Sequence, residues 1–308
     1  MKQTLGLQQI EMIGHLHHIG FYLGRTCIDM IRSIDSVEFH RLFVEEKSFR
    51  VEDCESVLTA LSRYDWIVSF LGHDNPDFEN NLIFAVNCRQ AADIAFLPLL
   101  PTTDSIDHVS DFYVRQFQQT LGAAYEFPNW THPLRTVHAK PDDHEHGRER
   151  LSSVGLTSNA KTVILHPGSG GPAKCWPLEN FVALAATLRQ KGMQVAFLLG
   201  PAETERWHPD KMGQLRSAAP ILSDLTLTES LQALCCADLF IGNDSGVSHL
   251  SAALGLCSLV LFGPSNPTLY RPIGPKVQIL TESPDSFARS DPAAVQKVTD
   301  SALKLLND

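Results

Sequence analysis

Two glycine-rich loops hold the side chains with the clearest chemical potential. The first, His166-Pro-Gly-Ser-Gly-Gly-Pro-Ala-Lys-Cys-Trp-Pro177, combines glycines with the Ser169 hydroxyl and the Lys174 ammonium. Glycines let backbone N–H groups approach a phosphate closely, and a lysine adds a point charge. The loop therefore indicates an anion site, although its composition alone fits a glycine-rich turn with a solvated lysine equally well.

The second loop, Ile241-Gly-Asn-Asp-Ser-Gly-Val-Ser-His-Leu250, runs directly into a predicted helix. We expect Asp244 or Ser245 to cap that helix, and the amides near Ser245 and Gly246, aided by the helix dipole, to attract an anion. His249 lies one turn further on the same face and could reach the same anion. Taken singly, Asp244 is more simply a cap and His249 a satisfied helix histidine. Two such loops on neighbouring strands favour a shared diphosphate site.

The second half of the chain reads as alternating strands and helices, which must position these loops. Short apolar runs bounded by glycine or proline predict strands, and apolar residues at helical spacing predict helices. The strands are expected at Thr162–His166, Gln194–Leu199, Ile221–Leu225, Asp238–Gly242 and Ser258–Phe262, and the helices at Leu178–Gln190, Thr228–Cys236 with Thr228 as its cap, and Ser245–Gly255. This alternation predicts an α/β fold with a parallel sheet covered on both faces, where ligands bind at the carboxyl ends of the strands.

The first half is the same kind of chain but less regular. Strands are predicted at Gln9–Ile13, Asp65–Leu71 and Ala91–Pro98, and a helix at His108–Leu121. The stretch from Phe127 to Asn159 is proline-containing and polar, which is typical of a linker. We therefore predict a first domain over residues 1–125, a linker over 126–158 and a second domain over 159–308.

Composition limits the possible partners and location. The 308 residues can bury two cores, and no run is apolar enough to span a membrane or to form a signal peptide. Residues 1–150 carry 13 Lys and Arg against 22 Asp and Glu, whereas residues 151–308 carry 12 against 13. A net charge of −10 argues against nucleic acid as a partner, and the near-neutral second half is the easier host for an anion. Seven cysteines without a CxxC pair fit a reducing, cytoplasmic location.

Three motifs in order resemble glycosyltransferase family 9, the heptosyltransferases of lipopolysaccharide assembly. They are His166-Pro-Gly-Ser-Gly…Lys174-x-Trp-Pro177, Gly242-Asn-Asp-Ser-Gly-x-Ser-His249 and Phe262-Gly-Pro-Ser-x-Pro267. The resemblance is specific from about Thr162 to Gly274 and thinner over residues 1–125. It implies a GT-B fold, with two Rossmann-like domains whose parallel sheets face across a cleft. It also implies a nucleotide-sugar donor bound by the C-terminal domain, without a metal ion or a cofactor.

Carried over by motif position, the resemblance gives a donor site. It assigns six residues to the diphosphate and sugar, with Asp244 ordering its loop or touching the sugar: Ser169, Lys174, Asp244, Ser245, Gly246 and His249. Glu203, in Gly200-Pro-Ala-Glu203, resembles the family's acidic contact to the ribose hydroxyls. A carboxylate suits a vicinal diol, but Glu203 could equally be a first-turn helix charge.

The opening of the chain departs from the family's pattern. Members begin with a strand and a loop ending in Gly-Asp, whose aspartate is the proposed general base. Here the first predicted strand, Ile10–Ile13, resembles the family's second, so we expect an incomplete N-terminal domain lacking one βα unit, about 30 residues. Unpaired strand edges should result. The catalytic base is unknown, with Asp65, Asp74 and Asp77 as the available acids.

The resemblance implies transfer of a heptose-like sugar to a lipid-linked or other glycan acceptor, met transiently at the inner membrane face. A catalytically impaired nucleotide-sugar-binding module is the alternative, because the Gly-Asp loop is missing. A sugar-nucleotide epimerase would need carboxylate and histidine pairs that the sequence does not display. The histidine clusters at 15–18 and 138–146 lack a recognised metal-ligand spacing.

Overall fold

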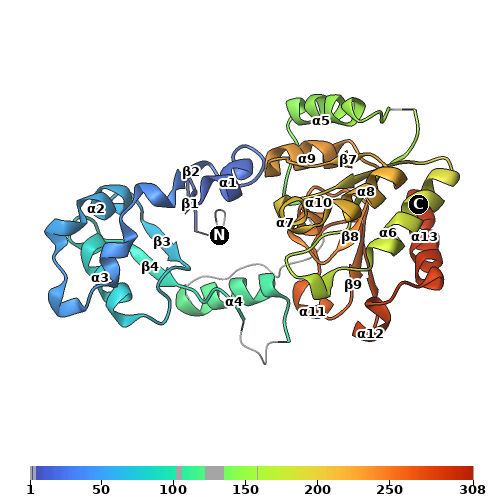
Figure 1. Ribbon diagram of the computed structural model, residues 1–308. Coiled ribbons are helices and arrows are strands. Elements are labelled where there is room, and N and C mark those ends of the chain that lie inside the picture. Colours follow the sequence, from blue (N-terminus) through green and yellow to red (C-terminus); the bar gives the residue numbers. More distant parts are fainter. Residues whose placement is uncertain (1, 3–4, 102–105, 122–134, 158, 308) are drawn as a thin grey trace. The chain divides into compact units, whose positions relative to one another are not determined.

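The computed structural model describes residues 2, 5–101, 106–121, 135–157 and 159–307 and divides the chain into two compact units (Figure 1). Unit 1 comprises Met1–Leu23 and Cys27–Trp130, and unit 2 comprises Gly24–Thr26 and Thr131–Asp308. The short segment Gly24–Thr26 joins unit 2 because Arg25 forms a buried ion pair with Asp143.

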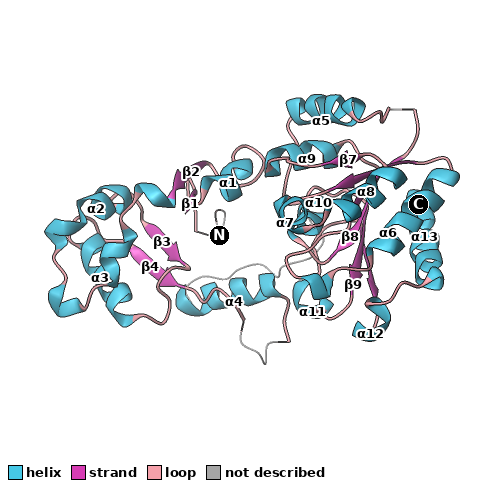
Figure 2. Cartoon of the chain, in the orientation of Figure 1, coloured by secondary structure: helices cyan, strands magenta, loops and turns pink. Residues whose placement is uncertain are grey.

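Unit 2 is built on six parallel strands among its described residues, in the order β10-β9-β8-β5-β6-β7 (Figure 2). They are β5 (Thr162–His166), β6 (Gln194–Leu198), β7 (Ile221–Leu222), β8 (Leu239–Asn243), β9 (Ser258–Phe262) and β10 (Val277–Thr281). The chain starts at β5, moves outward through β6 and β7, and returns to β8 on the other side of β5. The winding therefore reverses between β5 and β8, which is the topological switch point of a doubly wound sheet.

The core of unit 2 lies on both faces of this sheet. Every residue of β5, β8 and β9 is buried, as expected for parallel strands covered by helices on two sides. On one face Phe181, Leu184 and Leu188 of α6 pack with Val163 and alternate strand residues. The helices are α5 (Pro141–Ser153), α6 (Leu178–Gln190), α7 (Pro201–Arg206), α8 (Pro209–Ala218), α9 (Leu227–Cys235), α10 (Gly246–Ala253), α11 (Pro267–Tyr270), α12 (Pro284–Phe287), α13 (Pro292–Asn307) and the short 3-10 helix η6 (Pro172–Lys174).

Helix α5 occupies part of the stretch predicted as a linker, and there the structure differs from the expectation. Asp143, Gly147 and Leu151 are its buried residues, spaced four apart on one face. Gly147 packs so closely on α9 that an added Cβ would meet the Gln232 carbonyl at 2.1 Å. The sequence did not indicate this buried face, because Gly147 has no side chain and Asp143 is charged. The Asp143 charge is paired with buried Arg25. The division at 1–125, 126–158 and 159–308 remains a prediction, and residues 126–134 lie outside the described part.

Several elements of unit 2 begin and end where the sequence predicted, but α9 begins earlier. The strands Thr162–His166 and Ser258–Phe262 and the helix Leu178–Gln190 have the predicted bounds. The predicted cap of α9 was wrong, because Thr226 rather than Thr228 accepts the Glu229 N–H, while the Glu229 carboxylate accepts the Thr226 N–H in return. Because of this reciprocal capping box, the cap lies two residues before the predicted Thr228, and α9 begins at Leu227.

Unit 1 contains two separate two-stranded parallel sheets, β1-β2 and β3-β4. Their strands are β1 (Glu11–Gly14), β2 (Met30–Ser33), β3 (Trp66–Ser69) and β4 (Asp93–Phe96), with helices α1 (Leu16–Ile19), α2 (Glu55–Leu61), α3 (Pro76–Asn87), α4 (Val109–Leu121) and the 3-10 helices η1 (Gly20–Tyr22), η2 (Ile34–Ser36), η3 (Phe39–Phe43), η4 (Glu46–Ser48) and η5 (Val51–Cys54). Among the described residues of this unit, β1 and β3 each pair along one edge only. The unit's main core forms instead around Phe78 and Leu82 of α3 and Leu61 of α2.

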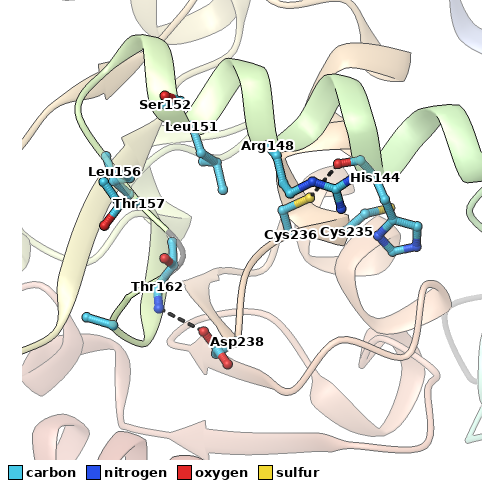
Figure 3. A pocket seen from close by; sticks show the side chains of 11 residues that line it. His144, Arg148, Leu151, Ser152, Leu156, Thr157, Thr162, Cys235, Cys236 and Asp238 are labelled. Atoms are coloured by element: carbon cyan, nitrogen blue, oxygen red, sulfur yellow. Dashed lines mark hydrogen bonds between the residues drawn. The ribbon is translucent and has the colours of Figure 1, made fainter.

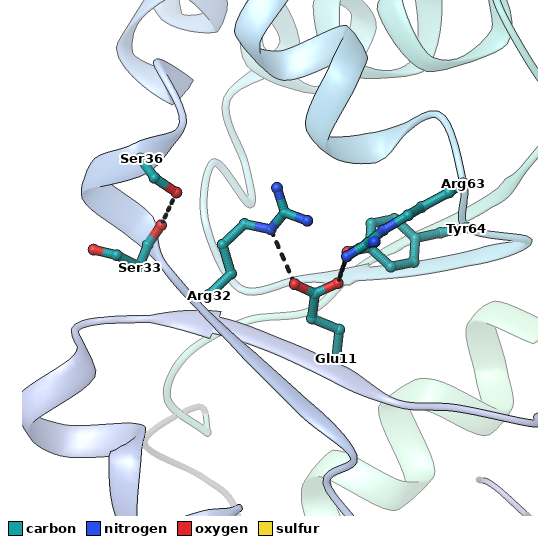
Figure 4. Close-up of polar contacts among 6 residues, drawn as sticks. All are labelled: Glu11, Arg32, Ser33, Ser36, Arg63 and Tyr64. Carbon is teal, nitrogen blue, oxygen red and sulfur yellow. Dashed lines mark hydrogen bonds and ion pairs between the residues drawn. The ribbon is translucent and has the colours of Figure 1, made fainter.

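A buried carboxylate links the two small sheets of unit 1. Glu11 of β1 accepts hydrogen bonds from Arg32 at 2.9 Å and from Arg63 and Tyr64, which come just before β3 (Figure 4). Burial raises the pKa of Glu11, but the hydrogen bonds from Tyr64, Arg32 and Arg63 outweigh it, so the net pKa is lowered. Side chains, rather than a shared strand, therefore join β1 to the segment preceding β3.

Candidate functional site

The two glycine-rich loops lie side by side because β5 and β8 are paired. His166 ends β5 opposite Gly242 of β8, so both loops leave the sheet at its carboxyl edge at the switch point. In doubly wound sheets this is where ligands bind. The sheet topology therefore brings together two motifs that are about 75 residues apart in the sequence, as the Ser169–Asp244 separation shows.

Asn243 joins the loops through its side chain. It is fully buried, and its Nδ2 donates to the Pro167 carbonyl at 2.9 Å and to the Gly168 carbonyl at 3.3 Å. Its Oδ1 accepts the Trp176 N–H at 3.0 Å. One carboxamide thus holds both ends of the first loop against the second. The sequence reading did not single out Asn243; the available signal was its place as the polar residue that ends an apolar strand.

A charged cluster sits on this scaffold. Asp244 is buried, and its Oδ2 pairs with Lys174 Nζ at 2.7 Å while its Oδ1 lies 4.0 Å from His249 Nε2. The Ser169 hydroxyl donates to the Asp244 carbonyl at 2.7 Å. The structure therefore brings Ser169, Lys174, Asp244 and His249 into one group, with the Lys174 and His249 side chains 43% and 44% exposed. The buried Asp244 carboxylate thus holds the Lys174 and His249 side chains, and both side chains remain partly exposed to solvent.

The start of α10 completes the group. Ser245 is the N-cap, with its hydroxyl accepting the Ser248 N–H, and Ser248 Oγ donates to the Asn243 carbonyl at 2.5 Å. Gly246 is the first helical residue, and nothing lies within 4 Å of where its Cβ would be. The first amides of a helix have no intrahelical partner, and the dipole makes this end attractive to an anion. Asp244 and Ser245 were the two residues expected to cap this helix, and Ser245 is the N-cap of α10.

Glu203 lies beside the first loop in a buried position. Its Oε2 accepts the Gly200 N–H at 2.8 Å, and a Cβ on Gly168 would meet its Oε1 at 2.0 Å. The glycine at 168 is therefore required for the carboxylate to fit. Neighbouring His166 is buried with Nδ1 2.8 Å from the Leu198 carbonyl; burial lowers the pKa of His166, and the Glu203 charge partly opposes that shift.

The three acids considered for a base occupy different positions in unit 1. Asp65 precedes β3 at its amino end, and its Oδ1 is 3.4 Å from Gln90 Nε2. Asp77 lies in the first turn of α3 and accepts the Glu46 N–H at 2.9 Å. Asp74 lies in the loop that follows β3, has a left-handed φ of 63°, and pairs with His73 at 3.0 Å with its side chain 88% exposed.

Within the described ranges, no three His, Cys, Asp or Glu side chains are grouped so that they could hold a metal ion. The rings of His15 and His17 are stacked, and the rings of His17 and His18 are tilted relative to each other with centroids 3.9 Å apart. Among all the residues that the structure describes, no helix has the length and apolar character needed to cross a bilayer.

The chain thus consists of a doubly wound α/β unit, with two glycine-rich loops at its switch point, and a second α/β unit. Residues 105–297, more than half of the chain, match glycosyltransferase family 9 (heptosyltransferase). The chain belongs to this family.

Individual relatives show how far the similarity extends. The chain is 28% identical over 135 residues to lipopolysaccharide heptosyltransferase 2 of Salmonella typhimurium, covering 42% of this chain and 38% of that protein. It thus spans less than half the length of the curated relatives it matches. The structure of the family 9 glycosyl transferase from Veillonella parvula matches with a TM-score of 0.69 at 20% identity, covering 97% and 88% of the two chains. That of the E. coli heptosyltransferase WaaC with ADP matches with a TM-score of 0.63 at 15% identity, covering 98% and 92%. The fold is therefore GT-B.

Proposed function

We propose that this protein transfers a heptose-like sugar from an ADP-heptose type of nucleotide-sugar to a lipopolysaccharide or other glycan acceptor. The observation that carries the proposal is the cluster of Lys174, Asp244 and His249 beside the start of α10, at the switch point of unit 2. Membership in family 9 and the likeness to an enzyme solved with ADP support the same donor class.

The donor diphosphate would bind where the two loops meet. Lys174 Nζ and the amides of Ser245 and Gly246 are donors of the kind that a diphosphate requires. Asp244 would not bind the anion itself; it holds Lys174 and His249 in place by charge. As the glycosidic bond to the diphosphate breaks, negative charge grows on the leaving oxygen, and donors already fixed in position stabilise it. Ser169 would keep the first loop fixed to the second through the Asp244 carbonyl.

Glu203 would accept hydrogen bonds from the ribose diol of the donor. Its carboxylate is buried at the edge of the first loop, beside Gly168. A buried carboxylate is costly unless it is well partnered, and a vicinal diol supplies two donors. Its contact with the Gly200 N–H also places Glu203 in the first turn of α7, so in this proposal Glu203 would have both of the roles that the sequence left open.

We further propose Asp74 as the acceptor-side base. It is the one acid of the three that lies in the loop after β3, on the carboxyl side of the strand where ligands of parallel sheets bind. Its exposure gives an acceptor hydroxyl access, whereas Asp77 is engaged with the Glu46 amide. Asp74→Asn should lower turnover about 100-fold or more while leaving donor affinity unchanged. Asp65→Asn, on the amino side of the same strand, is the matched control; equal losses in both variants would remove Asp74 from this role.

The acceptor is expected to be lipid-linked or another glycan, met transiently at the inner membrane face by a cytoplasmic protein. The acidic first half supports transient rather than tight attachment, since anionic lipid repels it. Recovery of most of the protein in a salt-resistant membrane fraction would contradict this expectation.

The donor proposal is tested by titrating ADP into Lys174→Ala and into the control Lys191→Ala, whose lysine is exposed at the end of α6. A charge-assisted hydrogen bond contributes about 1.5–3 kcal/mol, so Lys174→Ala should weaken binding about tenfold or more. Lys191→Ala should bind as the wild type does. Equal affinity in all three proteins would remove Lys174 from the site. Turnover of ADP-heptose with an acceptor then separates an enzyme from a module that binds its donor without transferring sugar.

A further inference from the structure

A cavity of unit 2 lies at the amino ends of the strands, opposite the edge from which the two glycine-rich loops leave the sheet. It has a volume of 540 Å³ and is bounded by α5, the end of α9 and the residues that begin β5 and precede β8 (Figure 3). Leu151 and Leu156 form part of its lining, together with the hydroxyl groups of Ser152 and Thr157. This volume is in the range of small-molecule sites, which combine apolar walls with a few polar groups.

A smaller hollow of 270 Å³ continues this cavity along the amino ends of the strands. The two hollows share His144, Cys235 and Asp238 in their lining and are therefore adjacent, and we call them together the α5 cavity. The smaller part adds Arg135, which lies against Gly255, and Lys276, which precedes β10.

The charged groups around the α5 cavity leave it positive. Arg135, Arg148 and Lys276 all line it, and among the residues that the structure describes none of them is paired with a carboxylate. The carboxylate in the lining is Asp238, whose oxygens already accept Lys161 Nζ at 2.9 Å and the Thr162 N–H at 2.8 Å.

Arg148 and Arg135 are exposed residues, and their charges act on the two thiols that line the same hollows. Burial raises the pKa of the Cys236 thiol, and the charge of Arg148 opposes that shift (Figure 3). Burial likewise raises the pKa of Cys235 to about 12, against the opposing charges of Arg25 and Arg135. Arg148 lines the larger hollow together with Cys236, and Arg135 lines the smaller one together with Cys235.

We propose that the α5 cavity is a binding site for a phosphate-bearing small anion, separate from the donor site. Arginine guanidinium groups match phosphate oxygens in a bidentate geometry, and Lys276 supplies a further charge. The leucine-lined part would hold the body of such a molecule. Because α5 and α9 close over the cavity, a bound anion would also tie α5 more firmly to the sheet.

The thiols provide a local readout for this proposal. Inorganic pyrophosphate is added to the full chain, and the rate of maleimide labelling is measured at each cysteine by peptide mass spectrometry. Cys236 reports on the α5 cavity and Cys175, in the first donor loop, reports on the donor site, whereas the exposed Cys27 and Cys88 report on general effects. We expect pyrophosphate to slow the labelling of Cys236 while leaving Cys27 and Cys88 unchanged.

Variants decide whether the cations are responsible. Arg148→Gln and Arg135→Gln should each weaken the protection of Cys236 about fivefold or more, since each removes a charge-assisted contact. Arg216→Gln, which removes an exposed arginine of α8, and Lys174→Ala, which disables the donor site, should leave that protection intact. The proposal is overturned if pyrophosphate does not protect Cys236, or if protection survives both arginine variants. Loss of Cys175 protection alone would count against the proposed donor site and not against this one.

Discussion

The strands of the two units differ in burial, although β5, β8 and β9 of unit 2 are only one residue longer than the strands of unit 1. Every residue of β5, β8 and β9 is buried in unit 2, whereas every residue of β1, β2 and β3 is only half-buried in unit 1. In unit 2 the inner strands have a neighbour on each side, while among the described residues β1 and β3 each have one. A parallel sheet is stable when helices cover both faces of a continuous set of strands. We therefore expect unit 2 to be the stable unit and unit 1 the weaker one.

The same difference bears on where chemistry can be held rigidly. The two glycine-rich loops leave two adjacent, buried strands, and the Asn243 side chain holds them together. The loop that carries Asp74 leaves a strand with a single neighbour. If the proposed donor site is correct, donor binding should therefore depend little on unit 1, whereas the proposed base, Asp74, belongs to that unit.

The largest expected effect is a matched pair of strand substitutions. Ile164 is fully buried in β5, and Ile67 is half-buried in β3. Ile164→Ala should cost about 3–4 kcal/mol of unfolding free energy, because a buried isoleucine leaves a cavity, and Ile67→Ala should cost about half of that. Denaturant unfolding, followed by probes in each unit, measures both. An equal loss of unfolding free energy in the two variants would contradict the expectation that unit 2 is the more stable unit.

A buried ion pair in unit 2 predicts a specific acid sensitivity. Burial raises the pKa of Asp143, but hydrogen bonds from Arg25 and the Lys140 N–H outweigh it and lower the pKa to about 2 from 3.8. Because the folded pKa lies below the unfolded one, the stabilisation is complete above pH 3.8 and is lost as the pH falls through 2. It amounts to about 2 kcal/mol.

The measurement is the unfolding free energy of the wild type and of Asp143→Asn between about pH 5 and about pH 1, both values being about one unit outside the titration window. The variant should be less stable at pH 5, since it leaves Arg25 buried without its partner. Its pH dependence should be flatter than that of the wild type. Parallel pH profiles would show that Asp143 does not titrate as proposed.

The smallest effect concerns the capping of α9. Thr226→Ala removes the cap that accepts the Glu229 N–H and should cost about 1 kcal/mol. Thr228→Ala, at the position that the sequence favoured, should change stability by only a few tenths of a kcal/mol. Thermal unfolding of the two variants distinguishes them, and the opposite ranking would restore the cap predicted from the sequence.

The sequence predicted unit 2 well because its signals are local. Apolar runs such as Thr162–His166 end at glycine or proline, and the two donor motifs follow such runs directly. The roles of Asn243 and Arg25 could not be read in the same way, because their partners lie far along the chain, 76 residues away for Pro167 and 118 for Asp143. Helix α5 was missed because its buried stripe contains Asp143 and Gly147, which carry no apolar signal. In unit 1, β2 was missed because Met30–Ser33 is short and half polar.

Hydrogen exchange with and without ADP tests the central claim, that the donor site belongs to the rigid sheet of unit 2, most directly. Peptides covering the loops at residues 167–177 and 244–250 should exchange more slowly when ADP is bound, whereas those covering β5 and β8 should exchange slowly even without it. Peptides covering β1 to β4 should exchange faster in both states and should not respond to ADP. Protection by ADP confined to unit 1, or strands of unit 1 as protected as β5 and β8, would contradict the account.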